Sequence, residues 1–177
     1  MGKTYFIADL HFGDSRIIGY ENRPFQSAAH MDAELITRWN RTVGPDDRVF
    51  LLGDVAITSP EATAAATTQL AGYKILVLGN HDRHLPVAWW FTAGFQEVSA
   101  YPLVLDEFYL LSHEPLYVNA TMPYANIFGH VHGSPLYVDA SPQSFCVSAE
   151  RIDYTPIEFT EIKRRIGAPL NPTGREA

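Results

Sequence analysis

Five short apolar segments of this sequence each run directly into side chains that are common metal ligands. Short apolar runs of this kind are typical of strands buried in a core. In an open α/β sheet the carboxyl ends of the strands share one edge, and ligands bind along that edge. We therefore expect the polar residues that follow these segments to lie close together. The segments and the residues after them are 5–8 with Asp9-Leu10-His11, 49–52 with Gly53-Asp54, 75–78 with Gly79-Asn80-His81-Asp82, 109–112 with His113, and 126–128 with Gly129-His130-Val131-His132.

Helical patterns separate the first three of these segments. Residues 28–43 repeat apolar side chains on one helix face after Ser27, a residue type that favours the N-cap. Ser59 and Pro60 indicate the start of a second helix, which we expect to reach about residue 71, and residues 86–92 predict a short third helix.

The second half of the chain is strand-like, and a last strand with a short helix is expected over residues 157–166. A β-α-β-α-β half followed by a β-rich half predicts an α/β sandwich. The predicted strands are 3–8, 48–52, 74–78, 97–105, 108–112, 125–128, 136–140 and 145–149.

At 177 residues the chain has the length of one domain. We expect this domain over residues 1–166. A flexible tail is expected over residues 167–177, because this stretch contains Pro and Gly residues near the chain end. No apolar run approaches the 18 or so residues of a membrane span, and the N-terminus lacks the pattern of a signal peptide. The single cysteine, Cys146, excludes an intrachain disulfide. These features predict a cytoplasmic protein with no membrane partner.

The net charge of -7 argues against general nucleic-acid binding. A small phosphorylated substrate remains compatible with it, because bound metal ions supply local positive charge. Seven potential ligands are more than one ion needs, and they suit two ions that share a carboxylate. Their oxygen and imidazole donors, with no thiolate, favour Mn²⁺, Fe or Zn²⁺. The seven are Asp9, His11, Asp54, Asn80, His113, His130 and His132.

The order of these motifs resembles the calcineurin-like metallophosphoesterase superfamily, in particular its small stand-alone bacterial-type branch. The motifs are Asp9-x-His11, Gly53-Asp54, Gly79-Asn80-His81-Asp82, the solitary His113 and Gly129-His130-x-His132. The resemblance covers about residues 3–160. It implies a four-layer α/β/β/α sandwich, which agrees with the order of predicted strands and helices.

The resemblance also implies roles for individual residues. Two divalent ions are implied as cofactors, with Mn²⁺ favoured and Fe, Zn or Ni as alternatives. A hydroxide between the ions is implied as the nucleophile that attacks phosphorus. His81 matches the catalytic histidine, which contacts the phosphoryl group and protonates the leaving alkoxide. One ion is assigned Asp9, His11, Asp54 and His132, and the other Asp54, Asn80, His113 and His130, with Asp54 as the bridge.

One stretch departs from the pattern of the superfamily's protein Ser/Thr phosphatases. Those phosphatases carry Gly-Asp-x-x-Asp-Arg. This chain has Ile57 in place of the second Asp and Thr58 in place of the phosphate-binding Arg. A phosphomonoester dianion would lack that arginine, which favours a phosphodiester substrate. Arg16, Arg23 and Arg83 are candidates to contact the substrate instead.

The sequence therefore predicts a metal-dependent phosphoric ester hydrolase that acts on a small phosphodiester or nucleotide. A phosphomonoesterase is one alternative, and a nuclease acting on short oligonucleotides is another. A third alternative is a non-catalytic interaction scaffold that keeps the fold; a damaged ligand set is expected for it, whereas all seven ligand positions and His81 are present here. Asp82 is left as a candidate to orient a neighbouring group. No pattern in the sequence predicts an oligomeric state.

Overall fold

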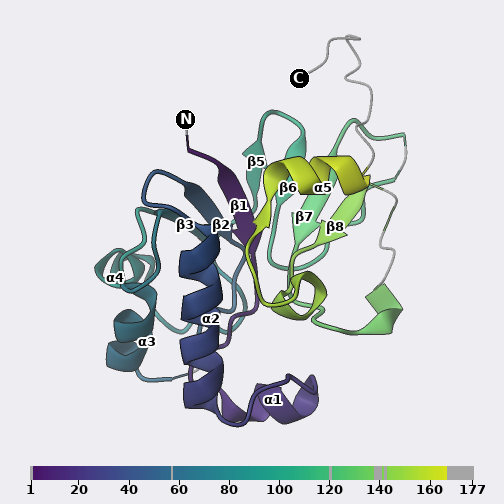
Figure 1. Ribbon diagram of the computed structural model, residues 1–177. Helices are drawn as coiled ribbons and strands as arrows, with labels where there is room; N and C mark the ends of the chain where they lie inside the picture. The colour runs from purple at the N-terminus through teal and green to yellow at the C-terminus, as the bar shows by residue number, and fades with distance from the viewer. Residues whose placement is uncertain (1, 57, 120, 138–140, 142, 167–177) are drawn as a thin grey trace.

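The computed structural model describes residues 2–56, 58–119, 121–137, 141 and 143–166, and it contains two β-sheets packed face to face (Figure 1). The first sheet has the strand order β4-β3-β2-β1-β9, and the second has the order β5-β6-β7-β8. Strands β1 to β4 run parallel to one another, and so do β6 to β8, whereas the edge strands β9 and β5 are antiparallel to their neighbours. The strands are β1 (Thr4–Ile7), β2 (Arg48–Leu51), β3 (Tyr73–Val77), β4 (Glu97–Ser99), β5 (Leu103–Leu105), β6 (Tyr109–Leu111), β7 (Ala125–Phe128), β8 (Ser144–Cys146) and β9 (Ile157–Glu158).

Helices pack on the outer face of the first sheet: α2, α3 and α4 lie on the side of the molecule away from the second sheet in Figure 1, whereas α1 lies below them at the bottom of the view. The predicted caps form: Ser27 accepts a hydrogen bond from the His30 backbone N–H at the start of α2, and Ser59 does the same for Ala62 at the start of α3. Met31, Leu35 and Trp39 are buried along one face of α2, as the apolar periodicity predicts. The helices are α1 (Ser15–Tyr20), α2 (Ala28–Thr42), α3 (Pro60–Thr67) and α4 (Val87–Thr92).

A second apolar core fills the space between the two sheets. Phe6 of β1 stacks on Phe50 of β2 with ring centroids 5.1 Å apart, and both are buried. The last helix, α5 (Phe159–Ile166), contacts the edge strands β9 and β8 and closes this core at one side. Its Phe159 ring packs against both Phe6 and Tyr109, so one aromatic cluster links α5 to both sheets.

The outer face of the second sheet is covered by the segment that follows β6. Buried Asn126 of β7 accepts a hydrogen bond from the Leu116 backbone N–H and donates one to the Ser112 hydroxyl. Val118 is also buried. Within the described residues, a loop rather than a long helix therefore forms the layer outside this sheet.

The structure corrects several predicted elements. The single strand predicted over residues 97–105 is two strands, β4 in the first sheet and β5 in the second, because the chain crosses between the sheets at residues 100–102. Helix α1 was not predicted. The strand predicted over residues 136–140 begins instead as a 3₁₀ turn, Pro135–Tyr137, and its remaining residues lie outside the described part of the chain. Helix α3 ends at Thr67, short of residue 71, and residues 149–152 form a 3₁₀ turn.

The two-sheet α/β architecture agrees with the predicted fold class. The predicted tail, residues 167–177, lies outside the described residues, so the division into a domain and a tail stays a prediction. Among the helices that the structure describes, none has the length and apolar character that crossing a bilayer requires.

Candidate metal centre

The backbone turns sharply where the predicted ligands follow their strands. Five of these residues adopt positive φ angles, a left-handed conformation that costs a non-glycine residue about 1–2 kcal/mol. Such strain persists only where the surrounding structure holds it, and it is frequent at functional sites. The five are Asp9 at 59°, His11 at 53°, Asp54 at 53°, His130 at 71° and His132 at 47°.

A first cluster of ligand atoms is formed by Asp9, His11 and His132, which approach within 4.8 Å of one another. His11 is 2% exposed, and neither of its ring nitrogens has a hydrogen-bond partner. Burial lowers the pKa of His11 to about 3, so the imidazole is neutral. A neutral, buried imidazole with two free nitrogens fits the requirements of a metal ligand.

A second cluster is formed by Asp54, His113 and His130, again within 4.8 Å of one another. The side-chain oxygen of Asn80 lies 2.9 Å from His113 Nε2 and 3.0 Å from His130 Nδ1, so Asn80 belongs to the same group of donors. The structure thus brings together all seven residues that the sequence singles out as candidate ligands.

The Asp54 carboxylate lies between the two clusters. Its Oδ2 atom is 3.6 Å from His11 Nε2 and 3.4 Å from His113 Nε2. Burial alone would raise the pKa of Asp54, but the hydrogen bond and charge of His113 lower it to about 2. Asp54 is therefore an ionised carboxylate that faces both sets of nitrogen donors.

Two of the histidines that follow strands of the second sheet have their Nδ1 atom hydrogen-bonded to a neighbouring group of the protein. His113 Nδ1 donates to the Leu52 carbonyl at 2.8 Å, and His132 Nδ1 donates to Glu150 Oε1 at 3.0 Å. In a neutral imidazole each of these bonds places the ring proton on Nδ1, so that Nε2 is the atom available to a cation, as is usual for histidines that ligate metals. His113 Nε2 contacts Asn80 Oδ1 at 2.9 Å and Asp54 Oδ2 at 3.4 Å. Burial would raise the pKa of Glu150, but His132 and Arg23 together lower it to about 2.

Glycines allow the ligand loops to approach one another closely. A Cβ atom on Gly79 would overlap the side chain and backbone of Asp54, and one on Gly129 would overlap Ala8. At Gly53, where φ is 85°, a Cβ atom would overlap both His113 and Gly79. Glycine is required at these positions because backbone and ligand atoms occupy the space of a side chain.

The sequence model of the family described as "Calcineurin-like phosphoesterase" matches residues 2–166. The chain belongs to the calcineurin-like phosphoesterase family. Family membership and the two clusters of Asp and His side chains together support a metal-dependent phosphoesterase.

This calcineurin-like phosphoesterase is similar in sequence to an archaeal and a phage protein, and similar in fold to a bacterial protein of known structure. The chain is 30% identical to the uncharacterized protein MJ1445 of Methanocaldococcus jannaschii, over 94% of this chain and 92% of that protein. It is 32% identical to the gene 66 protein of Mycobacterium phage L5, over 65% of this chain and 64% of the phage protein. The crystal structure of AQ665, a protein of unknown function from Aquifex aeolicus, matches with a TM-score of 0.74 at 23% identity, covering 93% of this chain and 99% of that one. The last match confirms the fold.

The remaining predicted residues of this phosphoesterase lie around the two clusters. His81 is at the rim: its side chain is 46% exposed, and its Nε2 atom is 4.0 Å from Asp54 Oδ2. Arg16 and Arg83 are exposed and form ion pairs with Asp14 at 3.1 Å and Glu114 at 3.2 Å.

Arg23 differs from these two exposed arginines. Its side chain is fully buried, and its guanidinium binds Glu150 and the backbone carbonyls of Asp9 and Leu10. In this structure Arg23 therefore contacts the ligand loops from inside the protein rather than from the substrate side.

Two residues near the clusters have roles that the ligand motifs do not reveal. Asp82, left open in the sequence as an orienting residue, accepts hydrogen bonds from the backbone N–H groups of Asp54, Val55 and Gly79 at 2.8–2.9 Å. Glu150 was not predicted at all, because it lies far along the chain from the ligands and no local motif marks it.

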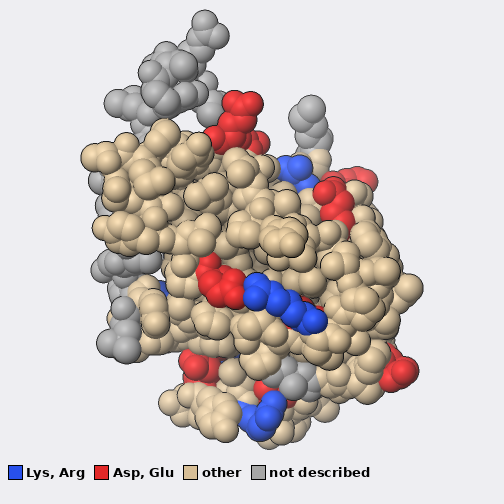
Figure 2. Space-filling view, turned by 180° about the vertical axis from the view of Figure 1, so that it is seen from behind, with Lys and Arg blue, Asp and Glu red and all other residues tan. Residues whose placement is uncertain are grey.

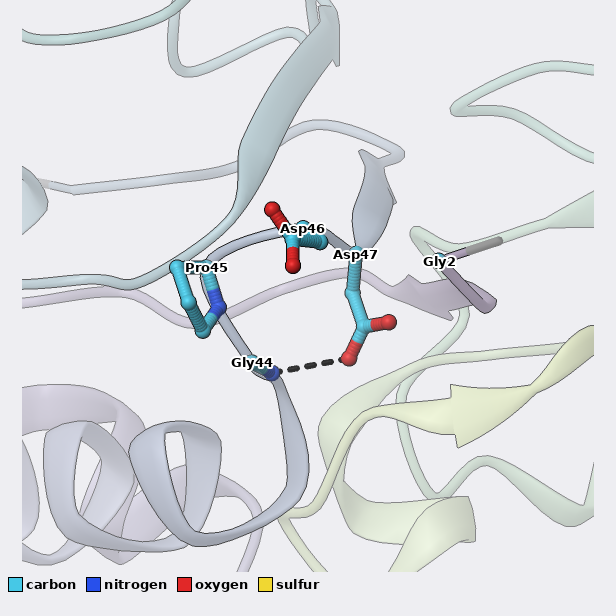
Figure 3. Close-up of a pocket in the computed structure, with 5 residues that line it drawn as sticks. All are labelled: Gly2, Gly44, Pro45, Asp46 and Asp47. Carbon is cyan, nitrogen blue, oxygen red and sulfur yellow. Dashed lines mark hydrogen bonds between the residues drawn. The ribbon is translucent and has the colours of Figure 1, made fainter.

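A surface hollow elsewhere in the molecule has different chemistry. It is lined by Gly2, Gly44, Pro45, Asp46 and Asp47, at the end of the first sheet where β1 and β2 begin (Figure 3). Asp47 accepts a hydrogen bond from the Gly44 N–H at 2.8 Å there. The candidate ligands follow the opposite, carboxyl ends of these strands, so this hollow is not part of the metal centre.

Proposed function

We propose that the protein is a dinuclear metal-dependent phosphodiesterase that hydrolyses a small phosphodiester or nucleotide. The observation that carries this proposal is the position of the Asp54 carboxylate, 3.6 Å from a nitrogen of the first cluster and 3.4 Å from a nitrogen of the second. A carboxylate shared by two groups of ligand atoms is typical of two-metal hydrolytic sites.

The ligand atoms divide into two sets around Asp54. When bound, two divalent ions would activate water for attack on phosphorus and stabilise negative charge on the phosphoryl oxygens. We propose Mn²⁺, with Fe, Zn or Ni as alternatives, because the donors are oxygen and imidazole nitrogen without a thiolate. In this proposal one ion is held by Asp9, His11, Asp54 and His132, and the other by Asp54, Asn80, His113 and His130.

His81 is proposed to protonate the leaving alkoxide. Its backbone N–H donates to Asp54 Oδ1 at 3.0 Å, which fixes the residue beside the shared carboxylate. Its ring is partly exposed and lies edge-on to His11, with centroids 5.4 Å apart. An imidazole at the open side of the centre is therefore placed to reach a substrate oxygen.

The charges around the centre favour a diester over a monoester. A monoester dianion carries one more negative charge than a diester and needs more positive charge beside it. The two exposed arginines, Arg16 and Arg83, are each paired with a carboxylate, and Thr58 stands where Ser/Thr phosphatases have arginine. We therefore propose a diester substrate that Arg16 or Arg83 contacts from the surface.

Binding to long nucleic acids is not part of this proposal. Figure 2 shows a face on which the described Lys and Arg side chains occur singly among Asp and Glu, without a continuous basic patch. Together with the net charge of -7, this argues against an extended polyanion as partner. A cytoplasmic location stays a prediction from the sequence.

The proposal is tested with the metal-stripped protein. Bis(p-nitrophenyl) phosphate and p-nitrophenyl phosphate are offered with and without added Mn²⁺. We expect hydrolysis only with Mn²⁺, faster for the diester, and none for Asp54→Asn. Asp47→Asn, a carboxylate change in the distant hollow of Figure 3, is the matched control and should keep full activity. Absence of metal-dependent hydrolysis would contradict the enzyme assignment, and faster monoester hydrolysis would contradict the diester preference.

A further inference from the structure

A buried ion pair lies directly behind the first cluster. Arg23 Nη2 is 2.6 Å and Arg23 Nε is 2.9 Å from Glu150 Oε1. The arginine side chain is 0% exposed and the glutamate side chain 7%. Desolvating two charges is costly, and a buried ion pair contributes little net stability compared with well-packed apolar side chains. The pair therefore calls for an explanation other than stability.

The arginine of this pair also donates hydrogen bonds to the loop that bears Asp9 and His11. Arg23 Nη2 donates to the Asp9 carbonyl at 2.7 Å, and Nη1 donates to the Leu10 carbonyl at 3.0 Å. The guanidinium also lies over the aromatic ring of Tyr154, with Arg23 Cζ 5.7 Å from the ring centroid. One guanidinium thus connects the loop that bears Asp9 and His11 to the turn that bears Glu150.

The glutamate of the pair orients the third residue of the cluster. Glu150 Oε1 accepts the Nδ1 proton of His132 at 3.0 Å. In the neutral imidazole of His132 this bond places the proton on Nδ1, so Nε2 is the atom available to a cation held with Asp9 and His11. A carboxylate in this position also makes the imidazole a stronger electron donor.

We propose that Arg23 and Glu150 are positioning residues that hold the loops of both sheets in register for the first metal ion. This proposal rests on the proposed function, because it assumes that Asp9, His11 and His132 bind a cation. Asp9 and His11 follow β1 of the first sheet, whereas His132 follows β7 of the second. The Arg23–Glu150 pair connects these two groups through hydrogen bonds to the Asp9 carbonyl and to His132 Nδ1.

A separate cation site at this place fits the contacts less well. Glu21, His132 and Glu150 also bring ligand atoms within 4.8 Å of one another. However, His132 Nδ1 already donates to Glu150, and the Arg23 guanidinium lies 2.6 Å from the same oxygen. A cation there would meet a fixed positive charge and displace a hydrogen bond, so we assign this group to positioning.

The test is a calorimetric titration of metal-stripped protein with Mn²⁺. The key variant replaces both charges together, Arg23→Met with Glu150→Met, so that no buried charge is left unpaired. We expect the native protein to bind two ions, and the double variant to lose about 10- to 100-fold in affinity at one of them. The affinity of the other ion should change by less than about twofold.

Glu150→Gln serves as the conservative variant. All the hydrogen bonds of Glu150 to Arg23 and His132 end on Oε1, so a glutamine oxygen can accept them while only the charge is lost. It should keep most of the Mn²⁺ affinity that the double variant loses, and the unpaired Arg23 charge should appear as a lower free energy of unfolding instead. Thr67→Val is the control, because Thr67 is buried and hydrogen-bonded to Ala93 but contacts no residue of the centre.

The outcomes separate the inference from the proposed function. Two ions bound by the double variant with native affinities would overturn the positioning role and leave the proposed function standing. Equal weakening of both ions would also overturn it, because the effect would then be general. Three ions bound by the native protein would favour a separate site at Glu150. If the native protein binds no Mn²⁺, the proposed function fails and the positioning role fails with it.

Discussion

The buried side chain of His11 lowers the free energy of unfolding unless its ring nitrogens bind a ligand. An unpaired buried polar group costs about 1–3 kcal/mol, and both ring nitrogens of His11 lack partners. Replacing His11 by phenylalanine keeps an aromatic ring and removes both nitrogens. We expect His11→Phe to leave the metal-free protein as stable as the native one, or about 1 kcal/mol more stable, while reducing its stabilisation by Mn²⁺. Urea unfolding with EDTA and with Mn²⁺ measures both effects, and a native-like response to Mn²⁺ would contradict the ligand role.

His81 is predicted to act on the substrate and not on the metal ions. Its ring lies outside both ligand clusters, so His81→Ala should bind Mn²⁺ as the native protein does. Loss of a general acid lowers kcat by about 10²- to 10⁴-fold. The measurement pairs a Mn²⁺ titration with steady-state kinetics on a phosphodiester whose leaving group is an alkoxide, because p-nitrophenolate leaves without being protonated. His30→Ala, on the exposed side of α2, is the control, and unchanged kcat in His81→Ala would exclude the proposed role.

At the level of single residues, the sequence predicts the candidate metal ligands better than the residues that hold those ligands in place. Each candidate ligand stands in a short motif after a strand, so local order along the chain is enough to find it. Arg23 and Glu150 are 127 positions apart, and only the fold brings them together. The sequence made Arg23 one of three candidates to contact the substrate, because an arginine near a phosphate site suggests that role, whereas the structure shows its side chain buried.

At the level of elements, Asp82 ties the loops that follow β2 and β3. Its two oxygens accept three backbone N–H bonds, from Asp54, Val55 and Gly79, and the side chain is fully buried. Asp82→Asn would turn an NH₂ group toward one or two of these donors. We expect a loss of about 2–4 kcal/mol in the free energy of unfolding, measured with urea.

The matched control for this variant is Asp47→Asn. Asp47 also accepts two backbone N–H bonds, from Lys3 and Gly44, but it is partly exposed, so water can replace them. Its loss should stay near 1 kcal/mol or below. Equal losses for the two variants would show that Asp82 is no more than an ordinary turn residue.

Strands were predictable where burial is continuous. β1, β2 and β3 lie within the predicted segments, or within one residue of them, because their apolar runs are buried on both faces. The segment 97–105 was predicted as one strand because its pattern shows no point at which the chain changes sheets. Pairing partners, not local pattern, decide that β4 joins β3 and β5 joins β6. Helix α1 is short, and only Asp14 at its N-cap marks it in the sequence.

At the level of the whole molecule, the candidate metal centre joins the two sheets. Asp9, His11 and Asp54 follow strands of the first sheet, whereas His113, His130 and His132 follow strands of the second. Direct contacts already exist across this junction, since the His130 N–H donates to the Asp9 carboxylate at 2.9 Å. Cations bound by both groups would therefore crosslink the sheets and stabilise the whole fold.

Metal binding is thus expected to appear as thermal stability. A ligand at 100 times its Kd stabilises the folded state by about 2.7 kcal/mol. For a protein of this size that corresponds to a rise in Tm of about 5 to 11 °C for each ion. Differential scanning calorimetry with EDTA and with increasing Mn²⁺ measures the shift. Because His132 belongs to the first cluster and His113 to the second, His132→Ala and His113→Ala should each reduce it by about half. A Tm that is independent of Mn²⁺ would show that the two sheets are held together without any bound cation.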